Sequence, residues 1–513
     1  MRRVYLTSPL YYVNAEPHIG HTYTTVIADT LARWHRARGD ATLLVTGTDE
    51  HGDKIAQAAA AAGATPRALA DRVSGLFRST WDVCGISYDY FVRTTDEDHV
   101  RTVQDILRRI EAAGDIYFGR YGGLYCYGCE RFYTEKELVD GTCPDHQVAP
   151  TYIEEENYFF RMSRYQQRLL DELEAHPERI RPDRYRNEVL ALLRGEVLGD
   201  LCISRPKARL SWGIELPFDD RYVAYVWVDA LTGYVSALRH LRAQEFDQYW
   251  PQTEHLIGKD ILKPHGVFWP TMLMSAGLPL YACLHVHGYW NHGESKMSKS
   301  LGNVIRPLEM KQRFGMDAFR YFLLREMAFG QDATFSEDAF VTRINADLAN
   351  NLGNLVSRTL AMQQRYFAGV VQPLGEPTDE DQRLRDAFRA ACQEVALFTE
   401  QLAFHRALEA LWRAIDHANK YIVTTSPFRL AKDPATAPRA GAVLHHVLEG
   451  LYVTAVLLQP FLPETADRML ALLGVPAADA LPAEWEWGTA LADGHVTGRA
   501  EPLFPRIETD GAA

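Results

Sequence analysis

The sequence predicts an α/β protein in which a parallel-sheet domain is interrupted by an insertion and followed by an α-helical bundle. Three observations lead to this prediction. Strand-like and helix-like stretches alternate in the first half, cysteines and glycine turns break the alternation near residue 115, and strand-like stretches cease after about residue 340. Strand–loop–helix repetition is typical of a parallel sheet with a ligand crevice at the carboxyl ends of its strands.

The alternation can be followed element by element. Before the break come strand-like VYLTSP (4–9), helix-like ADTLARWHRARG (28–39), strand-like TLLVTGTDEHG (42–52) and an alanine-rich helix. After residue 225 come helix-like ALTGYVSALRHL (230–241), strand-like EHLIGKD (254–260), helix-like GVFWPTMLMSAG (266–277) and strand-like CLHVHGYW (283–290). We interpret the two stretches as halves of one domain.

The last third of the chain has only helical periodicity. Four amphipathic stretches, most of them separated by loops that contain proline, predict a helical bundle: 346–367, 381–402, 405–422 and 441–462.

Composition sets further bounds. The 513 residues need two to four domains, and with 47% apolar and 24% charged residues they are ordinary for a globular protein. We expect no membrane segment, since no apolar run approaches the roughly 18 residues that a spanning helix needs. Thr7, Ser8 and Pro9 interrupt the region where a signal peptide is apolar. A formal charge of −13 argues against indiscriminate binding of nucleic acid, but not against recognition of one RNA at local basic patches.

Two short motifs are candidates for anion binding. PHIGH (17–21) lies between the first strand and its helix, where free backbone N–H groups and two imidazoles can face an anion, and Gly20 permits close approach. GESKMSKSLGN (293–303) places Lys296 and Lys299 between glycines, with no apolar period that core packing would explain. The alternatives are that His18 and His21 simply cap or pack, and that the lysine segment is a solvated turn.

A third motif predicts a structural metal. Its ligands have the spacing C-x2-C followed by C-x2-H: Cys126, Cys129, Cys143 and His146. Three thiolates and one imidazole form a closed tetrahedral zinc site with no position left for catalysis. The alternative is a chance grouping of reduced cysteines. Seven cysteines in all, an odd number, favour metal binding in a reducing cytoplasm over a disulfide framework.

Together these motifs resemble the class I aminoacyl-tRNA synthetases. HIGH and KMSKS are present letter for letter and in the family's order. YYVNAEPHIGH, GTDEHG, YVWVDALTGY and HLIGKDILKPHGVFWP are similar to the methionyl-tRNA synthetase family, and the resemblance extends to at least residue 430.

The resemblance implies a reaction and its residues. The methionine carboxylate attacks the α-phosphate of ATP, pyrophosphate leaves, and the adenylate esterifies the 3′-terminal adenosine of methionine tRNA. Such chemistry needs positioning and charge stabilisation, and Mg²⁺ accompanies the ATP. The residues implied for ATP binding and catalysis are His18, Gly20, His21, Lys296, Met297, Ser298, Lys299 and Ser300.

The family pattern also implies a methionine pocket, in which aromatic walls suit a thioether. Its residues are Leu10, Tyr12, Asp49, Trp227, Ala230, Tyr234, Ile261 and His265, with Asp49 holding the ammonium group. The alternative for Trp227 and Tyr234 is ordinary core, because their spacing is helical. His265 needs a polar partner if it is buried.

For the anticodon, the family pattern implies Asn354 and Arg358. Asparagine and arginine at this spacing on a helix face are also common without any function. The family places a tryptophan after a proline further on, where it stacks on an anticodon base. This chain has Pro427 and Phe428 there, so an aromatic face is kept and the indole N–H is lost.

The resemblance implies five regions: a Rossmann-like first half (1–115), a connective insertion with the zinc site (116–225), the second half (226–295), the KMSKS loop with a stem-contact region (296–345), and the anticodon-binding bundle (346–513). No insertion of a couple of hundred residues, as a large editing domain requires, separates the two halves. The sequence contains no appended tRNA-binding domain, and we expect a cytoplasmic monomer that charges initiator and elongator tRNA and binds no DNA.

Two alternatives stay open. One is another class I synthetase, for cysteine, leucine or isoleucine. The missing editing insertion disfavours leucine and isoleucine, and the position of the cysteine cluster disfavours cysteine. The other is a non-catalytic RNA-binding relative, against which the intact His18, His21, Lys296 and Lys299 argue.

Overall fold

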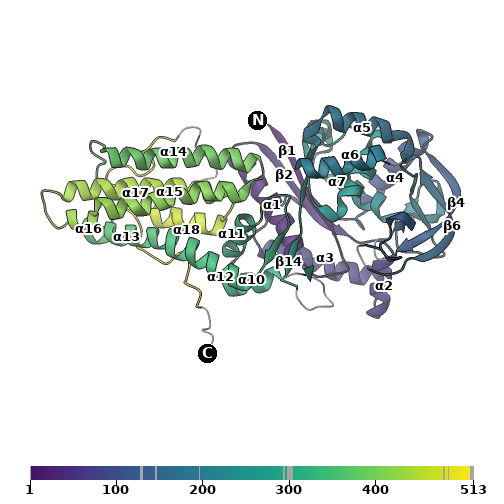
Figure 1. Cartoon of the computed structure of the whole chain (residues 1–513), viewed down its shortest axis with the longest axis horizontal. Coiled ribbons are helices and arrows are strands. Elements are labelled where there is room, and N and C mark those ends of the chain that lie inside the picture. Colours follow the sequence, from purple (N-terminus) through teal and green to yellow (C-terminus); the bar gives the residue numbers. More distant parts are fainter. Residues whose placement is uncertain are drawn as a thin grey trace. The chain divides into compact units, whose positions relative to one another are not determined.

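The computed structural model describes residues 2–126, 131–133, 135–144, 147–195, 197–292, 295–296, 304–477, 480–482 and 485–508. It divides into two compact units (Figure 1). The sheet unit comprises Arg2–Ala28 and Thr42–His287, and the helical unit comprises Asp29–Ala41 and Gly288–Ala513.

The sheet unit is built on a six-stranded sheet in the order β3-β2-β1-β12-β13-β7. The pairs β2–β3, β1–β12, β12–β13 and β13–β7 are parallel. The strands are almost wholly buried, as expected of a sheet covered by helices on both faces. This confirms the predicted parallel-sheet domain. Its strands are β1 (Arg3–Tyr12), β2 (Ala41–Asp49), β3 (Tyr90–Arg93), β7 (Ile180–Arg181), β12 (Thr253–Gly258) and β13 (Cys283–His287).

Helices connect these strands. The first begins earlier than the sequence predicts, at Ile19 instead of Ala28, so the loop after β1 is short and the HIGH motif begins the helix. A π-helical turn, Pro264–Phe268, precedes α9. The helices are α1 (Ile19–Ala37), α2 (Asp53–Ala61), α3 (Pro66–Val83), α4 (Glu97–Ala112), α5 (Gln166–Ala175), α6 (Asp183–Gly195), α7 (Val226–Arg242), α8 (Phe246–Tyr249) and α9 (Trp269–Ser275).

The predicted insertion forms two antiparallel sheets, in the orders β5-β4-β6-β8 and β10-β11-β9. One segment behaves differently: β7 lies within residues 116–225 and yet pairs in parallel with β13 of the main sheet. Two residues are too short a run to give a periodic signal. The other strands are β4 (Ile116–Cys126), β5 (Arg131–Tyr133), β6 (Thr151–Phe160), β8 (Leu201–Cys202), β9 (Ser204–Pro206), β10 (Glu215–Leu216) and β11 (Asp219–Ala224).

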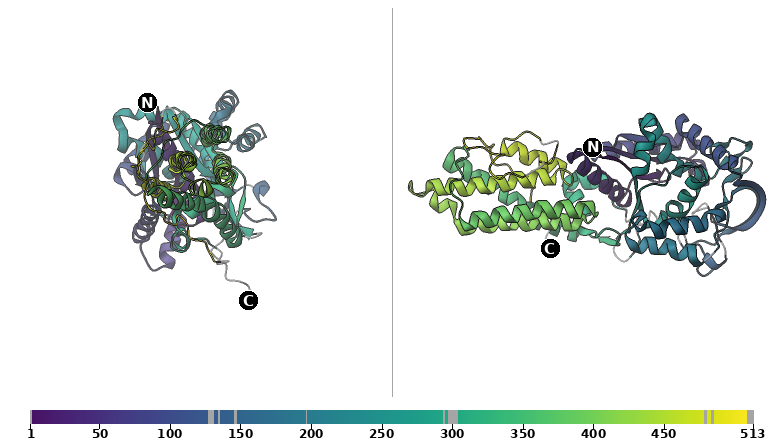
Figure 2. Two further views of the ribbon diagram at one scale, coloured as in Figure 1. Left: turned by 90° about the vertical axis from the view of Figure 1, so that its left-hand side faces the viewer. Right: turned by 90° about the horizontal axis from the view of Figure 1, so that it is seen from above.

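The helical unit confirms the predicted bundle. Figure 2 shows its long helices, coloured green to yellow, running side by side, and α14, α15 and α17 are in mutual contact. The bundle helices are α13 (Asn354–Phe367), α14 (Asp379–Glu400), α15 (Phe404–Thr425), α16 (Pro427–Leu430), α17 (Ala437–Leu458) and α18 (Pro463–Leu473). Before them come β14 (Trp290–His292), β15 (Ser295–Lys296), α10 (Pro307–Phe314), α11 (Met316–Glu326), β16 (Ala333–Phe335), α12 (Glu337–Arg343) and a π-helical segment, Ile344–Gly353.

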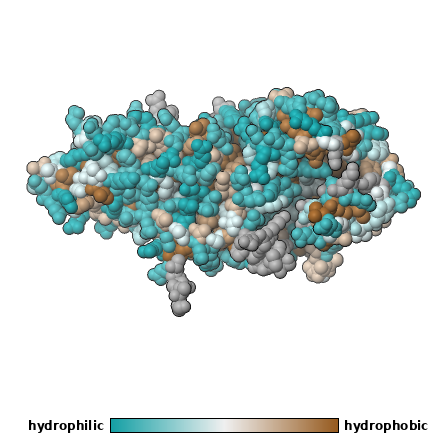
Figure 3. All heavy atoms as spheres, viewed as in Figure 1, coloured by the Kyte–Doolittle hydropathy of each residue, from teal (hydrophilic) through white to brown (hydrophobic). Residues whose placement is uncertain are grey.

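One helix corrects the expectation that no apolar run approaches a membrane span. Among the described residues, α17 is long and apolar enough to cross a membrane, but 94% of its apolar window is buried inside the protein. The visible face of the helical unit is mostly hydrophilic (Figure 3). The helix α17 is therefore the core of the bundle, where even His446 and Glu449 are buried.

Within the helical unit, a buried ion pair joins α11 to the second half of α1. The Arg320 guanidinium on α11 donates from Nη1 to Asp29 Oδ2 (2.7 Å) and from Nε to the carbonyl oxygen of Phe461 (2.8 Å). Both charged side chains are fully buried. Because Arg33 also donates to Asp29, this carboxylate has the several partners that burial of a charge requires.

Candidate functional site

Parallel pairing brings the ends of distant strands to one edge of the sheet. The strands β1, β2 and β12 end at Tyr12, Asp49 and Gly258, and they are neighbours in the order β2-β1-β12. The segments that follow them carry the HIGH motif, GTDEHG and HLIGKDI. In the sheet unit these three segments therefore begin at one edge of the sheet, the edge at which parallel sheets commonly bind ligands.

The HIGH imidazoles lie at the N-terminus of α1. His18 accepts the first helical hydrogen bond from Thr22 N (2.9 Å), and its ring stacks on that of His21 with centroids 3.8 Å apart. Backbone N–H groups donate to both Nδ1 atoms, from Gly20 to His18 (3.1 Å) and from His18 to His21 (3.4 Å). Each neutral ring therefore carries its proton on Nε2, from which it can donate to an anion.

Gly20 keeps this arrangement possible. A Cβ atom there would lie 3.0 Å from Cε1 of His18, closer than side chains normally approach. Tyr11 supports the second imidazole: its hydroxyl donates to the carbonyl oxygen of His21 (3.2 Å), and its ring lies 4.9 Å from the His21 ring. No sequence pattern singles out Tyr11, because the alternation of a strand indicates burial and not the partner.

The structure brings Trp227, Tyr234, Ile261 and His265 together. Tyr234 Oη lies 2.8 Å from His265 Nε2, and His265 Nδ1 lies 2.9 Å from the carbonyl oxygen of Ile261. A carbonyl oxygen can only accept, so Nδ1 carries the proton and Nε2 accepts from the tyrosine hydroxyl. The Trp227 ring is edge-on to that of His265 at 6.3 Å. His265 thus has the polar partners that its burial requires.

The remaining pocket residues lie on the adjoining elements. Leu10 of β1 packs against Gly233 of α7, where an added Cβ would lie 2.4 Å from Leu10 Cδ1. Lys54 lies over the Tyr12 ring at 5.8 Å, and both Asp49 and Ala230 are buried. His255, which no sequence pattern singles out, lies behind Tyr234 at 4.4 Å between ring centroids.

Burial keeps the His265 imidazole and the Tyr234 phenol uncharged. It lowers the pKa of His265 to about 4, although the hydrogen bond to Ile261 acts in the opposite direction. Burial also raises the pKa of Tyr234, and the nearby Tyr11 and Asp49 raise it further. At neutral pH an uncharged imidazole and an uncharged phenol therefore line the pocket, which suits an apolar, polarizable side chain.

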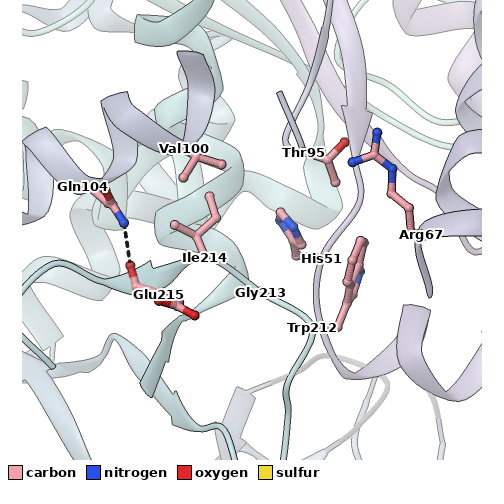
Figure 4. Close-up of a pocket in the computed structure, with 9 residues that line it drawn as sticks. All are labelled: His51, Arg67, Thr95, Val100, Gln104, Trp212, Gly213, Ile214 and Glu215. Atoms are coloured by element: carbon pink, nitrogen blue, oxygen red, sulfur yellow. Dashed lines mark hydrogen bonds between the residues drawn. The ribbon is translucent and has the colours of Figure 1, made fainter. Parts of the chain in front are cut away.

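A cavity of about 300 Å³ adjoins the segment after β2 (Figure 4). The His51 ring lies beside Trp212 in it, with ring centroids 5.1 Å apart. Trp212 Nε1 donates to the carbonyl oxygen of Glu50 (2.6 Å). The lining residues are His51, Arg67, Thr95, Val100, Gln104, Trp212, Gly213, Ile214 and Glu215.

Two of the four predicted zinc ligands are described. Cys126 and Cys143 are buried in one cluster with Tyr133, and Cys143 Sγ lies 3.3 Å from the Tyr133 hydroxyl. Cys129 and His146 lie outside the described residues. Within the part of the chain that the structure describes, no group of three or more potential ligands forms a metal site.

The KMSKS segment is described only in part. Lys296 belongs to the short strand β15, which pairs antiparallel with β14, so this position is not a loop. Met297, Ser298, Lys299 and Ser300 lie outside the described residues.

The predicted anticodon residues lie in the helical unit. Asn354 is exposed at the start of α13, and Arg358 donates from Nη2 to Asn419 Oδ1 on α15 (2.7 Å). Burial lowers the pKa of Arg358. Phe428 is 39% exposed at the start of α16, so its ring is accessible to a partner.

Two protein-family models match nearly the whole chain. The family described as tRNA synthetases class I (M) matches residues 4–152 and 146–360, and the anticodon binding domain of methionyl tRNA ligase matches residues 371–513. These matches and the fold show that the chain is a class I tRNA synthetase.

Individual relatives agree. The chain is 43% identical to the methionine–tRNA ligase of Caldanaerobacter subterraneus and 45% identical to that of Deinococcus radiodurans. Both alignments cover 99% of this chain, and they cover 79% and 75% of the two relatives, respectively. A solved Mycobacterium tuberculosis methionyl-tRNA synthetase in complex with methionyl-adenylate is 41% identical, with a TM-score of 0.93 over 99% of this chain and 100% of that one. The chain belongs to the methionyl-tRNA synthetase family.

The neutral state of His265 predicts a pH dependence of stability. In the unfolded chain its pKa is near 6.5, whereas in the folded protein it is about 4. Below pH 6.5 the unfolded state therefore binds a proton that the folded state does not. The free energy of unfolding decreases as the pH is lowered from 6.5 to about 4. We expect this residue to cost about 2 kcal/mol of stability between pH 7 and pH 4.5.

The measurement compares the free energy of unfolding of wild type and His265→Gln, obtained by urea denaturation at both pH values. The glutamine variant cannot titrate. The difference in free energy of unfolding between wild type and variant should therefore be about 2 kcal/mol smaller at pH 4.5 than at pH 7. A constant difference between the two proteins would contradict the neutral imidazole.

Proposed function

We propose that the chain is a methionine–tRNA ligase, which activates L-methionine with ATP to methionyl-adenylate and esterifies the 3′-terminal adenosine of methionine tRNA. AMP and pyrophosphate are the products. The observation that carries this proposal is the common edge in the sheet unit, where paired Nε2 donors at a helix N-terminus accompany the uncharged, hydrogen-bonded pair of Tyr234 and His265. Membership of the family supports it over the whole chain.

In the first step, a carboxylate oxygen of methionine forms a bond to the α-phosphorus of ATP, and the bond to pyrophosphate breaks. The Nε2–H groups of His18 and His21, with the positive end of the α1 dipole, stabilise charge on the phosphates. Lys296 and Lys299 neutralise the departing pyrophosphate. Mg²⁺ enters with the triphosphate and requires few protein ligands. No side chain forms a covalent intermediate, so the acceleration comes from positioning and electrostatics.

Methionine selection then depends on the pocket in its neutral form. The carboxylate of Asp49 binds the substrate ammonium, and the rings of Trp227 and Tyr234 enclose the thioether, where sulfur–aromatic contacts add about 1 kcal/mol. A protonated His265 would place a charge beside the apolar side chain, and burial prevents this. In the second step, a ribose hydroxyl of the terminal adenosine attacks the activated carbonyl carbon and AMP leaves.

The activity is tested by ATP–pyrophosphate exchange with a panel of amino acids. We expect exchange with methionine and none above background with cysteine, leucine or isoleucine. Lys299→Ala should lower the single-turnover rate of adenylation by two orders of magnitude or more, because charge on pyrophosphate is no longer neutralised, as removal of one oxyanion donor costs about 10²–10³-fold. Its affinity for methionine should change less than about twofold.

Lys311→Ala is the matched control, since Lys311 lies in the same unit near Glu464 and should not affect either step. Exchange with another amino acid would favour a different synthetase, and absence of exchange in the wild type would favour a non-catalytic relative. Unchanged adenylation in Lys299→Ala would remove the role given to that lysine.

We propose one structural zinc held by Cys126, Cys129, Cys143 and His146. The described residues fit this ion in one respect: two of the four ligands are buried in one cluster, at the end of β4 and beside the turn at Gly141. Four ligands would close the site, so the ion would supply folding free energy to the insertion and no chemistry.

Metal analysis of protein prepared without chelator should give about one zinc per chain. Cys126→Ser and Cys143→Ser should each lose the ion and lower the thermal midpoint, because the ion's binding free energy contributes to folding. Cys84→Ser, which removes a buried thiol outside the insertion, should keep full zinc content. Zinc below stoichiometry in the wild type would argue against the site.

We further propose that Asn354, Arg358 and Phe428 contact the anticodon, with the Phe428 ring stacking on a base. The exposure of Asn354 and of the Phe428 ring supports this role. Arg358 is partly occupied by Asn419, so a base would share or displace that contact.

Phe428→Leu should raise the KM for methionine tRNA about 5- to 100-fold, because base stacking on an aromatic ring contributes about 1–3 kcal/mol. Phe428→Trp should retain the wild-type value. Val423→Ala removes an exposed apolar side chain elsewhere in the bundle and is the control. A leucine variant with unchanged KM in aminoacylation assays would refute the stacking.

The finer assignments are proposals as well. They comprise the five regions with the bounds given above, cytoplasmic localisation, a monomeric state, and the use of both initiator and elongator tRNA. The pairing of β7 with β13 adds one feature to the regions, since part of the insertion (116–225) completes the main sheet.

A further inference from the structure

A buried carboxylate lies between two histidines beside the methionine pocket. Asp229 is 1% exposed, its Oδ2 lies 2.7 Å from His51 Nδ1, and its Oδ1 lies 2.6 Å from His99 Nε2. An ionised carboxylate only accepts hydrogen bonds, so both imidazoles donate to it. The three residues come from three separate elements.

These elements carry the walls of the proposed methionine pocket. His51 follows Asp49, the residue expected to bind the ammonium, by two positions. Asp229 lies in the first turn of α7, two positions after Trp227 and next to Ala230. His99, in the first turn of α4, also contacts Ser236 of α7 through Nδ1 at 2.9 Å. The carboxylate therefore joins the segment that carries Asp49 to the helix that carries Trp227.

The residue between Asp49 and His51 is fixed as firmly. The Glu50 side chain is fully buried, with Oε1 accepting from Arg93 Nε (2.7 Å) and Oε2 from the Thr95 hydroxyl (2.6 Å). Its carbonyl oxygen accepts from Trp212, which also packs on the His51 ring (Figure 4). The two residues that follow Asp49 are thus anchored in different directions, Glu50 to the Arg93 side and His51 to α7.

Burying the charged Asp229 carboxylate lowers the stability of the fold unless both histidines keep their hydrogen bonds to it. Burial disfavours the charged carboxylate, but attraction to His51 and the hydrogen bonds from both histidines outweigh it and hold the pKa of Asp229 below its usual value. A well-packed apolar side chain would join the same elements at no such cost, because a buried ion pair adds little net stability. What the charged cluster supplies is one fixed distance between the elements that it joins.

We propose that Asp229, through His51 and His99, is a positioning residue that fixes the Asp49 carboxylate relative to Trp227 and Ala230 for recognition of the substrate ammonium. This role rests on the proposed function. A displacement of about 1 Å at such a group can cost about 100-fold, so the cluster controls binding without touching the substrate.

Asp229→Asn tests the role with nearly the same shape. An amide has one accepting oxygen, and its NH₂ group can only donate, so one histidine must either lose the contact or change tautomer and accept from the amide, and either change disturbs the geometry of the cluster. Binding is measured by calorimetry for L-methionine and for its α-hydroxy analogue, in which a hydroxyl replaces the ammonium. We expect methionine to bind about tenfold more weakly, which is about 1.4 kcal/mol. The Kd of the analogue should change less than about twofold, since it makes no ion pair with Asp49.

His51→Gln and His99→Gln are second variants, and each should weaken the binding of methionine more than the binding of the analogue. These variants test the proposal if Asp229→Asn does not fold. Asp105→Asn is the matched control, because Asp105 pairs with Arg239 (2.9 Å) and so joins the same helices, α4 and α7, without contacting residues 49–51. Neither ligand should be affected by it.

Equal weakening of both ligands would mean a general structural role, and unchanged binding of both would mean no role; either result overturns the proposal. A wild-type protein that binds the analogue and methionine alike would overturn the ammonium recognition by Asp49 on which it rests. Failure of methionine-dependent pyrophosphate exchange in the wild type overturns the proposed function itself, and the two failures are therefore distinguishable.

Discussion

Parallel pairing of β1 with strands far away in the sequence is the constraint on which the sheet unit depends. Thr7 of β1 pairs with His255 of β12, and their side chains are joined by a 2.7 Å hydrogen bond across 248 residues of sequence. Because parallel strands end at the same edge, this register places the residues after β1, β2 and β12 together. Segments far apart in the sequence thus come to lie at one edge of the sheet, and the Val13 N–H, just after β1, donates to the carbonyl oxygen of Asp49 at the end of β2 (3.2 Å).

The hydrogen-bond partners of each buried titratable group in the sheet unit decide whether that group is neutral or charged. His265 faces a carbonyl oxygen and a phenol, which favour one neutral tautomer, and burial lowers its pKa. Asp229 faces two imidazoles, which keep it charged despite equal burial. Hydrogen-bond partners of opposite kind thus keep one buried group neutral and another charged within the same unit.

The helical unit uses the same device for a structural purpose. Arg320 and Asp29 are both buried, and the guanidinium also binds two main-chain carbonyl oxygens at Pro460 and Phe461. These contacts fix α11, the second half of α1 and the junction between α17 and α18 at one point. Breaking such a pair leaves a buried charge without compensation, which costs far more than the pair contributes in net stability.

The sequence by itself determined the class of fold, most of the long elements and the presence of the HIGH and KMSKS motifs. These features depend on local periodicity and on short motifs, both of which are visible in the amino-acid sequence alone. It did not predict that α1 begins at Ile19, that α17 is a buried core helix apolar enough to resemble a membrane span, or that β7 joins the main sheet. Only the tertiary structure decided that Asp229 pairs with His51, 178 residues away, and which nitrogen of His265 carries the proton. The reason is physical: a side chain's partner and protonation state depend on groups that folding brings near it, and no local pattern contains them.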